Sequence, residues 1–149
     1  MLAAILAVID SVILIAAGIL HVYWASGGAW GYPQSNGEFP EAGETLLGDP
    51  AFRRKRVIMR SIGLVCFIAA GLVLARVGIV TLPVQGRFVE YSLWALAGLF
   101  LLRALGDFRY TGLTRRVHGT VYARWDARLF TPLSLLLSIT IFVLNLIAS

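Results

Sequence analysis

The sequence predicts an all-α protein, a four-helix transmembrane bundle in which neighbouring helices run antiparallel. Four apolar runs carry this prediction, and they are Leu2 to Leu20, Val57 to Ala75, Tyr91 to Leu105 and Phe130 to Ile147. Each run is close to the ~20 residues that a helix needs to cross a ~30 Å hydrocarbon core. A chain in lipid satisfies its backbone hydrogen bonds only as a helix or a closed barrel, and these runs lack the alternation of barrel strands.

The composition agrees with a membrane protein of one domain. Hydrophobic residues make up 58% of the 149 residues, and the mean hydropathy is +0.80. We expect a single domain, 1–149, with helices at about 2–24, 57–75, 89–105 and 129–147. No Lys or Arg precedes the first run, and that run is longer than the apolar core of a secretory signal, so it is interpreted as a retained helix. The single cysteine, Cys66, is expected to be a packing residue.

The basic residues predict the orientation. Four spans place both termini and the 76–90 connection on one side, and the two long connections on the other. The first side holds Arg76 and Arg87, and the second holds eleven basic residues. These are Arg53, Arg54, Lys55, Arg56, Arg60, Arg103, Arg109, Arg115, Arg116, Arg124 and Arg128. The positive-inside rule therefore predicts that the long connections are cytoplasmic and that both termini are outside.

The net charge of +5 raises the question of partners. In a soluble protein such a charge would suggest nucleic acid, but beside apolar spans it favours membrane lipids with anionic head groups. No nucleic-acid partner is expected. The basic block 53–56 is interpreted as a head-group anchor, with a site for a specific anion as the alternative. A protein partner or a homo-oligomer stays open.

One candidate site follows the first apolar run and contains His21, Tyr23, Trp24 and Trp30, with several glycines between them. Aromatic side chains at a membrane boundary usually form an interfacial belt. A histidine near the hydrocarbon edge instead tends to face the bundle interior or a polar cavity. The segment is thus either a belt or a ligand site, and His21 is a candidate acid or base.

A second candidate site lies between residues 106 and 128, where charges of both signs alternate with aromatic side chains. The residues considered for ligand binding are Asp107, Arg109, Tyr110, Arg124, Trp125, Asp126 and Arg128. Arginine suits carboxylate or phosphate, and Asp107 or Asp126 could orient an arginine or transfer a proton. The alternative is a solvated loop with weak surface ion pairs. We expect Arg109 or Arg124 to stack on Tyr23, Trp24 or Trp30.

Polar residues also occur within the spans. Asp10 lies inside the first run, and a carboxyl group at that depth is a functional-site hypothesis by default. Asp10 and His21 are eleven positions apart and share one helix face. The last run carries the polar line Thr131, Ser134, Ser138 and Asn145. We expect a structural hydrogen bond to Asp10 from a hydroxyl or amide group of this last run, with Ser138 as the expected partner, and a proton or ion path is the alternative.

Three motifs carry a family resemblance. They are His21-x-Tyr23-Trp24-x-x-Gly27-Gly28-x-Trp30-Gly31, Gly106-Asp107-Phe108-Arg109-Tyr110-x-Gly112, and Ala123-Arg124-Trp125-Asp126-x-Arg128-Leu129-x-x-Pro132-Leu133. Together they resemble an uncharacterised family of small bacterial four-helix membrane proteins, known as a domain of unknown function. The resemblance implies the fold and a location in the bacterial cytoplasmic (inner) membrane. It implies no activity.

Three classes of function follow from these observations. The first is a membrane protein that binds an anionic ligand, lipid or partner at the cytoplasmic face. The second is a membrane-embedded enzyme acting on an amphipathic substrate, and the third is a small proton-coupled transporter that uses Asp10. The chain lacks the usual nucleotide-binding and hydrolase motifs. No metal or other cofactor is expected, because two histidines and one cysteine are too dispersed to suggest a site.

Overall fold

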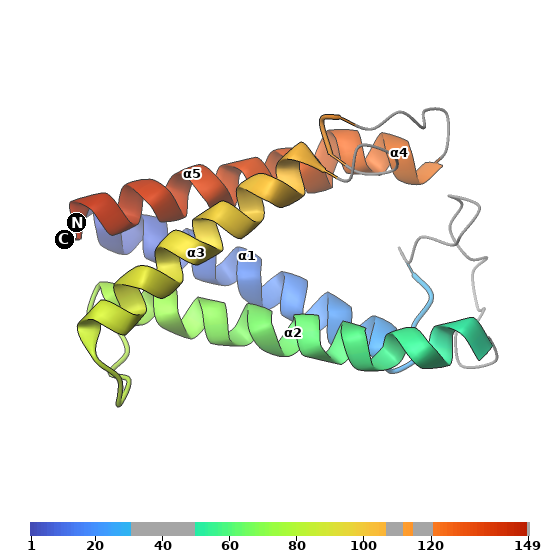
Figure 1. Ribbon diagram of the computed structural model, residues 1–149, viewed down its shortest axis with the longest axis horizontal. Coiled ribbons are helices and arrows are strands. Elements are labelled where there is room, and N and C mark those ends of the chain that lie inside the picture. Colours follow the sequence, from blue (N-terminus) through green and yellow to red (C-terminus); the bar gives the residue numbers. More distant parts are fainter. Residues whose placement is uncertain (31–49, 107–111, 115–120, 149) are drawn as a thin grey trace.

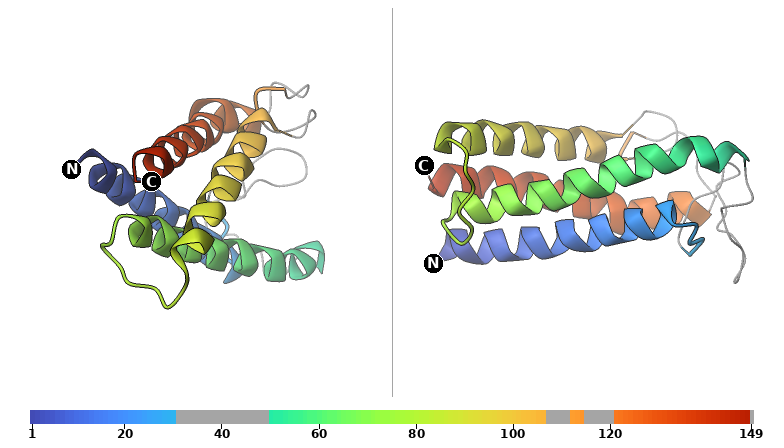
Figure 2. Two further views of the ribbon diagram at one scale, coloured as in Figure 1. Left: turned by 60° about the vertical axis from the view of Figure 1, so that its left-hand side comes forward. Right: turned by 90° about the horizontal axis from the view of Figure 1, so that it is seen from below.

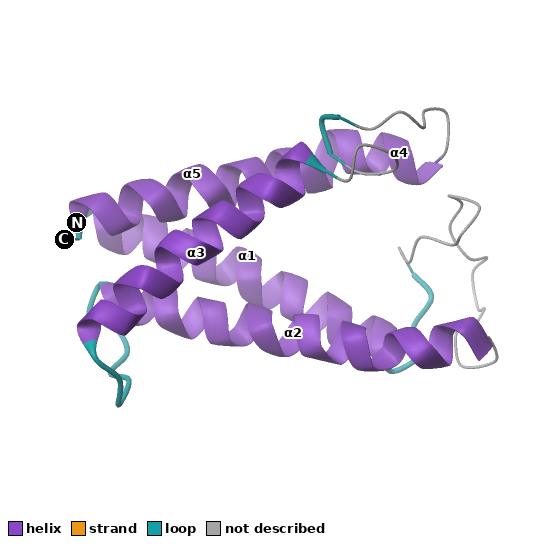
Figure 3. Cartoon of the chain, viewed as in Figure 1, coloured by secondary structure: helices purple, strands orange, loops and turns teal. Residues whose placement is uncertain are grey.

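The computed structural model describes residues 1–30, 50–106, 112–114 and 121–148. The helices are α1 (Leu2–Ala25), α2 (Pro50–Arg76), α3 (Gly86–Leu105), α4 (Val121–Trp125) and α5 (Thr131–Ile147), and the π-helical turn η2 (Asp126–Phe130) joins α4 to α5. Figure 3 shows no strand in this part of the chain. Four helical segments are long and apolar enough to cross a membrane, which confirms the all-α, four-helix prediction. They are Leu2–Ala25, Lys55–Arg76, Gly86–Leu105 and Ala123–Ile147.

Three helical segments begin earlier than their apolar runs, and one of them is α3, which begins at Gly86 rather than at Tyr91. Helix α2 begins at Pro50 rather than near Val57, so it includes the basic block. Arginine and lysine are good helix formers, and proline fits the first turn of a helix, so the helix continues beyond the apolar run. The last segment likewise begins at Val121, because α4 and η2 precede α5.

The two ends of the bundle differ in what they carry. Figure 1 shows both termini and the connection between α2 and α3 at one end, here called the terminal end. The opposite end, called the long-loop end, carries the connections from α1 to α2 and from α3 to α4. Consecutive spans therefore run antiparallel, as expected.

The helices pack as two pairs. Helix α1 packs mainly on α2, and α3 packs mainly on α5 (Figures 1 and 2). Glycine permits the close approach in the first pair, because a Cβ atom at Gly63 would lie 3.1 Å from the carbonyl oxygen of Gly18. Small residues at a helix contact are typical of membrane proteins.

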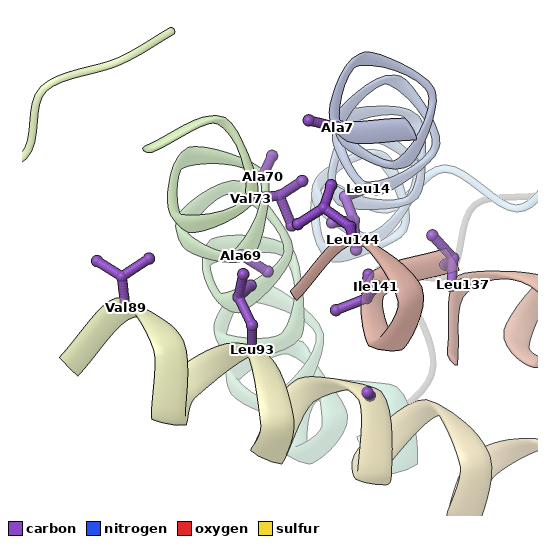
Figure 4. Packing of buried hydrophobic residues seen from close by; sticks show 11 residues of the cluster. Ala7, Leu14, Ala69, Ala70, Val73, Val89, Leu93, Leu137, Ile141 and Leu144 are labelled. Atoms are coloured by element: carbon purple, nitrogen blue, oxygen red, sulfur yellow. The ribbon is translucent and has the colours of Figure 1, made fainter. Parts of the chain in front are cut away.

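The apolar core that joins the two pairs lies toward the terminal end (Figure 4). Its buried members are Ala7, Leu14, Ala69, Ala70, Val73, Val89, Leu93, Ala97, Leu137, Ile141 and Leu144. Toward the long-loop end the first pair has a separate cluster around Trp24 and Ala29. Figure 1 shows the pairs diverging in this direction, so each pair builds its long-loop end from its own residues.

Candidate functional site

Asp126 is a buried residue with several hydrogen bonds at the long-loop end. Its side chain is 0% exposed. The Oδ1 atom accepts a hydrogen bond from Nη2 of Arg103 at 2.7 Å. The Oδ2 atom accepts one from the backbone N–H of Gly112 at 2.7 Å and one from the Thr131 hydroxyl at 2.9 Å. These four residues, here called the Asp126 cluster, thus satisfy a buried carboxylate with one cation and two further donors.

The end of α3 explains how Gly112 reaches the carboxylate. Helix α3 ends at Leu105, and Gly106 and Gly112 both have positive φ angles, which glycine adopts without strain. A Cβ atom at Gly112 would collide with the backbone of Gly106, so only glycine fits this contact. The N–H groups of Leu113 and Thr114 then donate to the carbonyls of Ala104 and Leu105, at 2.9 and 3.1 Å. Residues 112–114 therefore cap α3 and present the Gly112 N–H to Asp126.

The π-helical turn explains the position of Thr131. Asp126 opens η2, and the backbone N–H of Thr131, five residues later, donates to the Asp126 carbonyl. The same spacing places the Thr131 hydroxyl beside the Asp126 carboxylate. Single π turns are rare and are frequent at functional sites. Here the turn brings the final span, the end of α3 and the 112–114 segment together on one carboxylate.

Replacing Thr131 with valine should lower the free energy of unfolding by about 1.5 kcal/mol, because valine keeps the shape and removes one donor to a buried carboxylate. Thermal unfolding in detergent measures this effect. Thr131→Ser keeps the hydroxyl and serves as the matched control. Equal midpoints for the valine and serine variants would contradict the assigned bond.

The contacts of Asp126 join the end of α3, residue Gly112 and the final span. Its oxygens are occupied by Arg103, Gly112 and Thr131, and its side chain has no exposed surface. The hypothesis that Asp126 transfers a proton receives no support from this arrangement and stays a hypothesis. Among the described residues near Asp126, Arg124, Trp125 and Arg128 are exposed.

The segment from His21 to Trp30 forms a compact helix end. The Nδ1 atom of His21 lies 2.8 Å from the carbonyl oxygen of Ala17, and its ring meets Trp24 edge to face at 5.1 Å. The indole N–H of Trp24 donates to the Trp30 carbonyl at 2.8 Å. Gly28 lies against the ring of Tyr23, where a side chain would collide. The Trp30 backbone thus returns to the helix end, while the residue is 76% exposed.

The predicted stacking of an arginine on these rings is not seen for Arg124. Arg124 is exposed on α4, which belongs to the pair of α3 and α5, whereas Tyr23, Trp24 and Trp30 belong to the other pair. Figure 1 shows these two long-loop ends apart. The other predicted ligand residues of this region, Asp107, Arg109 and Tyr110, lie outside the described residues.

The polar line of the last span is buried, and two of its members, Ser138 and Asn145, donate to α3. Ser138 donates to the carbonyl of Ala97 at 2.9 Å, and the Asn145 amide donates to the carbonyl of Glu90 at 3.1 Å. The Ser134 hydroxyl donates to the carbonyl oxygen of Phe130, one helical turn earlier in the chain, at 2.8 Å.

The expected pairing of Ser138 with Asp10 is therefore wrong. The partner of Asp10 is Thr140, whose Oγ1 atom lies 2.6 Å from Oδ1 of Asp10. Two positions differ by ~200° around a helix, so a Ser138 that faces α3 leaves Thr140 on the side of α1. Asp10 is 0% exposed, and its partner is a hydroxyl group of the last span. Both features are expected of an Asp10 that has a structural role.

In the described part of the chain, two polar links join the helix pairs toward the terminal end. One is the contact of Asp10 with Thr140. The other is Arg76, whose Nε and Nη2 atoms donate to the side-chain and backbone oxygens of Asn145, at 2.8 and 3.3 Å. Sequence reasoning assigned no site role to Arg76, Arg103 or Thr140. The position of Arg103 inside an apolar run could have indicated its pairing with an acidic residue, because a cation that is removed from water needs an acidic partner.

Among the described residues, no group of three or more histidine, cysteine, aspartate or glutamate side chains could hold a metal ion. The fold and its buried polar contacts define an integral membrane protein with four helices. The chain belongs to the family described as "Protein of unknown function (DUF3995)", whose model matches residues 14–141. This match agrees with the resemblance to an uncharacterised family. A comparison with curated proteins and a comparison with solved structures each found no significant match.

Proposed function

We propose that this protein binds anionic phospholipid head groups at the long-loop end, and that this end faces the cytoplasm in the bacterial inner membrane. One observation carries the proposal. The described long-loop end has the exposed basic side chains Lys55, Arg60, Arg124 and Arg128, which are distributed over both helix pairs. The only acidic side chain among the described residues of this end is Asp126, and Arg103 neutralises it.

Aromatic side chains support the same proposal. Tyr23, Trp30 and Trp125 are exposed at this end, two in the first pair and one in the second. Exposed aromatic rings beside basic side chains suit the head-group level of a membrane, where the ring lies among lipid and the cation meets phosphate. The binding surface proposed here therefore consists of Lys55, Arg60, Arg124, Arg128, Tyr23, Trp30 and Trp125.

Lipid binding should depend on these cations. We expect the Arg60→Gln, Arg128→Gln double variant to bind phosphatidylglycerol roughly thirtyfold more weakly, because each basic residue near an anionic surface contributes about 1 kcal/mol. Native mass spectrometry of the purified protein, titrated with phosphatidylglycerol or phosphatidylcholine, measures the difference. Added salt should reduce the binding of phosphatidylglycerol.

The matched control is Arg87→Gln, which removes an exposed arginine at the terminal end. This variant should bind phosphatidylglycerol as the natural chain does. Equal retention of the two lipids by the natural chain would contradict the proposal, and so would an equal loss in Arg87→Gln and the double variant.

The orientation has its own test. In a Cys66→Ser background, we expect a membrane-impermeant maleimide to label Ser149→Cys on intact cells. Gly37→Cys should react only after permeabilisation, because the eleven basic residues hold the long connections in the cytoplasm. Labelling of Gly37→Cys with protection of Ser149→Cys would reverse the orientation.

A further inference from the structure

Asp10 and Asp126 are both fully buried, but their surroundings differ. Asp126 has a cation and two further donors. Asp10 has one neighbour with a proton to donate, the Thr140 hydroxyl, and its Oδ2 atom has no hydrogen-bond partner among the described residues. A buried carboxylate with one donor and an unpartnered oxygen is an unfavourable arrangement, because the charge is neither paired nor solvated.

The hydrogen bonds of Thr140 give a second reason why an ionised Asp10 is unfavourable. Its Oγ1 atom lies 2.6 Å from Oδ1 of Asp10 and also 2.8 Å from the carbonyl oxygen of Leu136. A threonine hydroxyl has a single proton to donate and two lone pairs to accept with. If Asp10 were ionised, the one proton of Thr140 would have to serve two acceptors. If Asp10 carries a proton, it donates to Thr140, and Thr140 donates to Leu136.

No charged side chain near Asp10 changes this count of hydrogen-bond donors and acceptors. Helix α5 has no titratable side chain between Thr131 and Ile147. On α2 the only one between Arg60 and Arg76 is Cys66, which is half-buried. The other titratable side chains of α1 are His21 and Tyr23, at its far end. On α3, Arg87, Glu90, Tyr91 and Arg103 are present, and no ion pair joins either arginine to Asp10 in the described part of the chain.

We propose that Asp10 is a proton-binding site, and that a neutral carboxylic acid joins α1 to α5 through the chain from Asp10 Oδ1–H to Thr140 Oγ1–H to the Leu136 carbonyl. The 2.6 Å contact is short enough for an O–H···O hydrogen bond in either direction, and the bond of Thr140 to the Leu136 carbonyl decides the direction. Oδ2 is then the oxygen of a neutral carbonyl, for which an absent partner is far less unfavourable than for a charged one. The proton-binding site lies at one of the two polar links between the helix pairs.

Infrared spectroscopy of the natural protein in lipid tests the proposal. We expect a C=O stretching band of a protonated carboxyl group near pH 7, where an aspartate in water, with its pKa of about 3.9, is fully ionised. The band should move to lower frequency when the protein is made with ¹³C-carboxyl aspartate, a test that requires no variant. It should disappear in Asp10→Asn, and in Thr140→Val it should move to higher frequency without being lost.

The matched control is Glu90→Gln, which changes a carboxyl group outside the core and should leave the band unaltered. Absence of the band near pH 7 would overturn the proposal, and so would a band that does not respond to labelled aspartate. A band that persists unaltered in a folded Asp10→Asn variant would assign the proton to another residue and would overturn it equally.

Discussion

The variant Asp126→Ala should lose about 3 kcal/mol of folding free energy. The change leaves the Arg103 cation without its partner and the Gly112 N–H without its acceptor. Breaking a buried ion pair costs about 3–5 kcal/mol, and the lower value applies because 35% of the Arg103 side chain is exposed. Thermal unfolding in detergent measures the loss as a lower midpoint.

Two further variants separate the ion pair from the fold around it. The double variant Arg103→Met, Asp126→Leu should recover much of the lost stability, because no uncompensated charge remains. Arg124→Ala removes an exposed arginine of the same segment and should stay within about 0.5 kcal/mol of the natural chain. An Asp126→Ala protein with an unchanged midpoint would show that the Asp126 cluster does not stabilise the long-loop end of the pair formed by α3 and α5.

The second large effect is expected at Asp10. Asp10→Asn should be at least as stable as the natural chain, because its amide N–H can donate to Thr140 while Thr140 keeps its bond to Leu136. Asp10→Leu should be less stable by about 2–3 kcal/mol. It loses a hydrogen bond worth about 0.6 kcal/mol and forces a branched side chain into a fully packed position, which costs a further 1–3 kcal/mol.

The comparison of asparagine with leucine is made by thermal unfolding in the same detergent. Val12→Leu, at an exposed position of the same helix, is the control and should leave the midpoint unchanged. Equal stability of Asp10→Asn and Asp10→Leu would remove the structural role of the hydrogen bond between α1 and α5.

The fold could be predicted because the membrane requirement is so simple. An apolar run of sufficient length must be a helix, so Leu2 to Leu20 and the other three runs identified the spans directly. The ends of the helices were harder to predict from the sequence. Hydropathy marks where lipid begins, whereas the start of α2 at Pro50 depends on backbone hydrogen bonds that continue through a polar segment.

The candidate site could be predicted only in part, for a geometric reason. Asp126 was recognised from its type and its place in a motif, but its bonds to Arg103 and Gly112 join segments that are distant in sequence. The partner of Asp10 was assigned from depth alone, which Ser138 and Thr140 nearly share. Their direction around the helix decides between them, and that direction is set by the packing of α5 on α3.

Packing as two pairs has a consequence for how the chain assembles. Each pair consists of spans that are consecutive in sequence, and each has its own internal links, such as Arg56 to the Ala25 carbonyl in one and Ser138 to the Ala97 carbonyl in the other. Each hairpin can therefore form in the bilayer before the two associate. The connection 77–85 then makes the last step intramolecular, so we expect the two halves to form separately and to dock through the core near the terminal end.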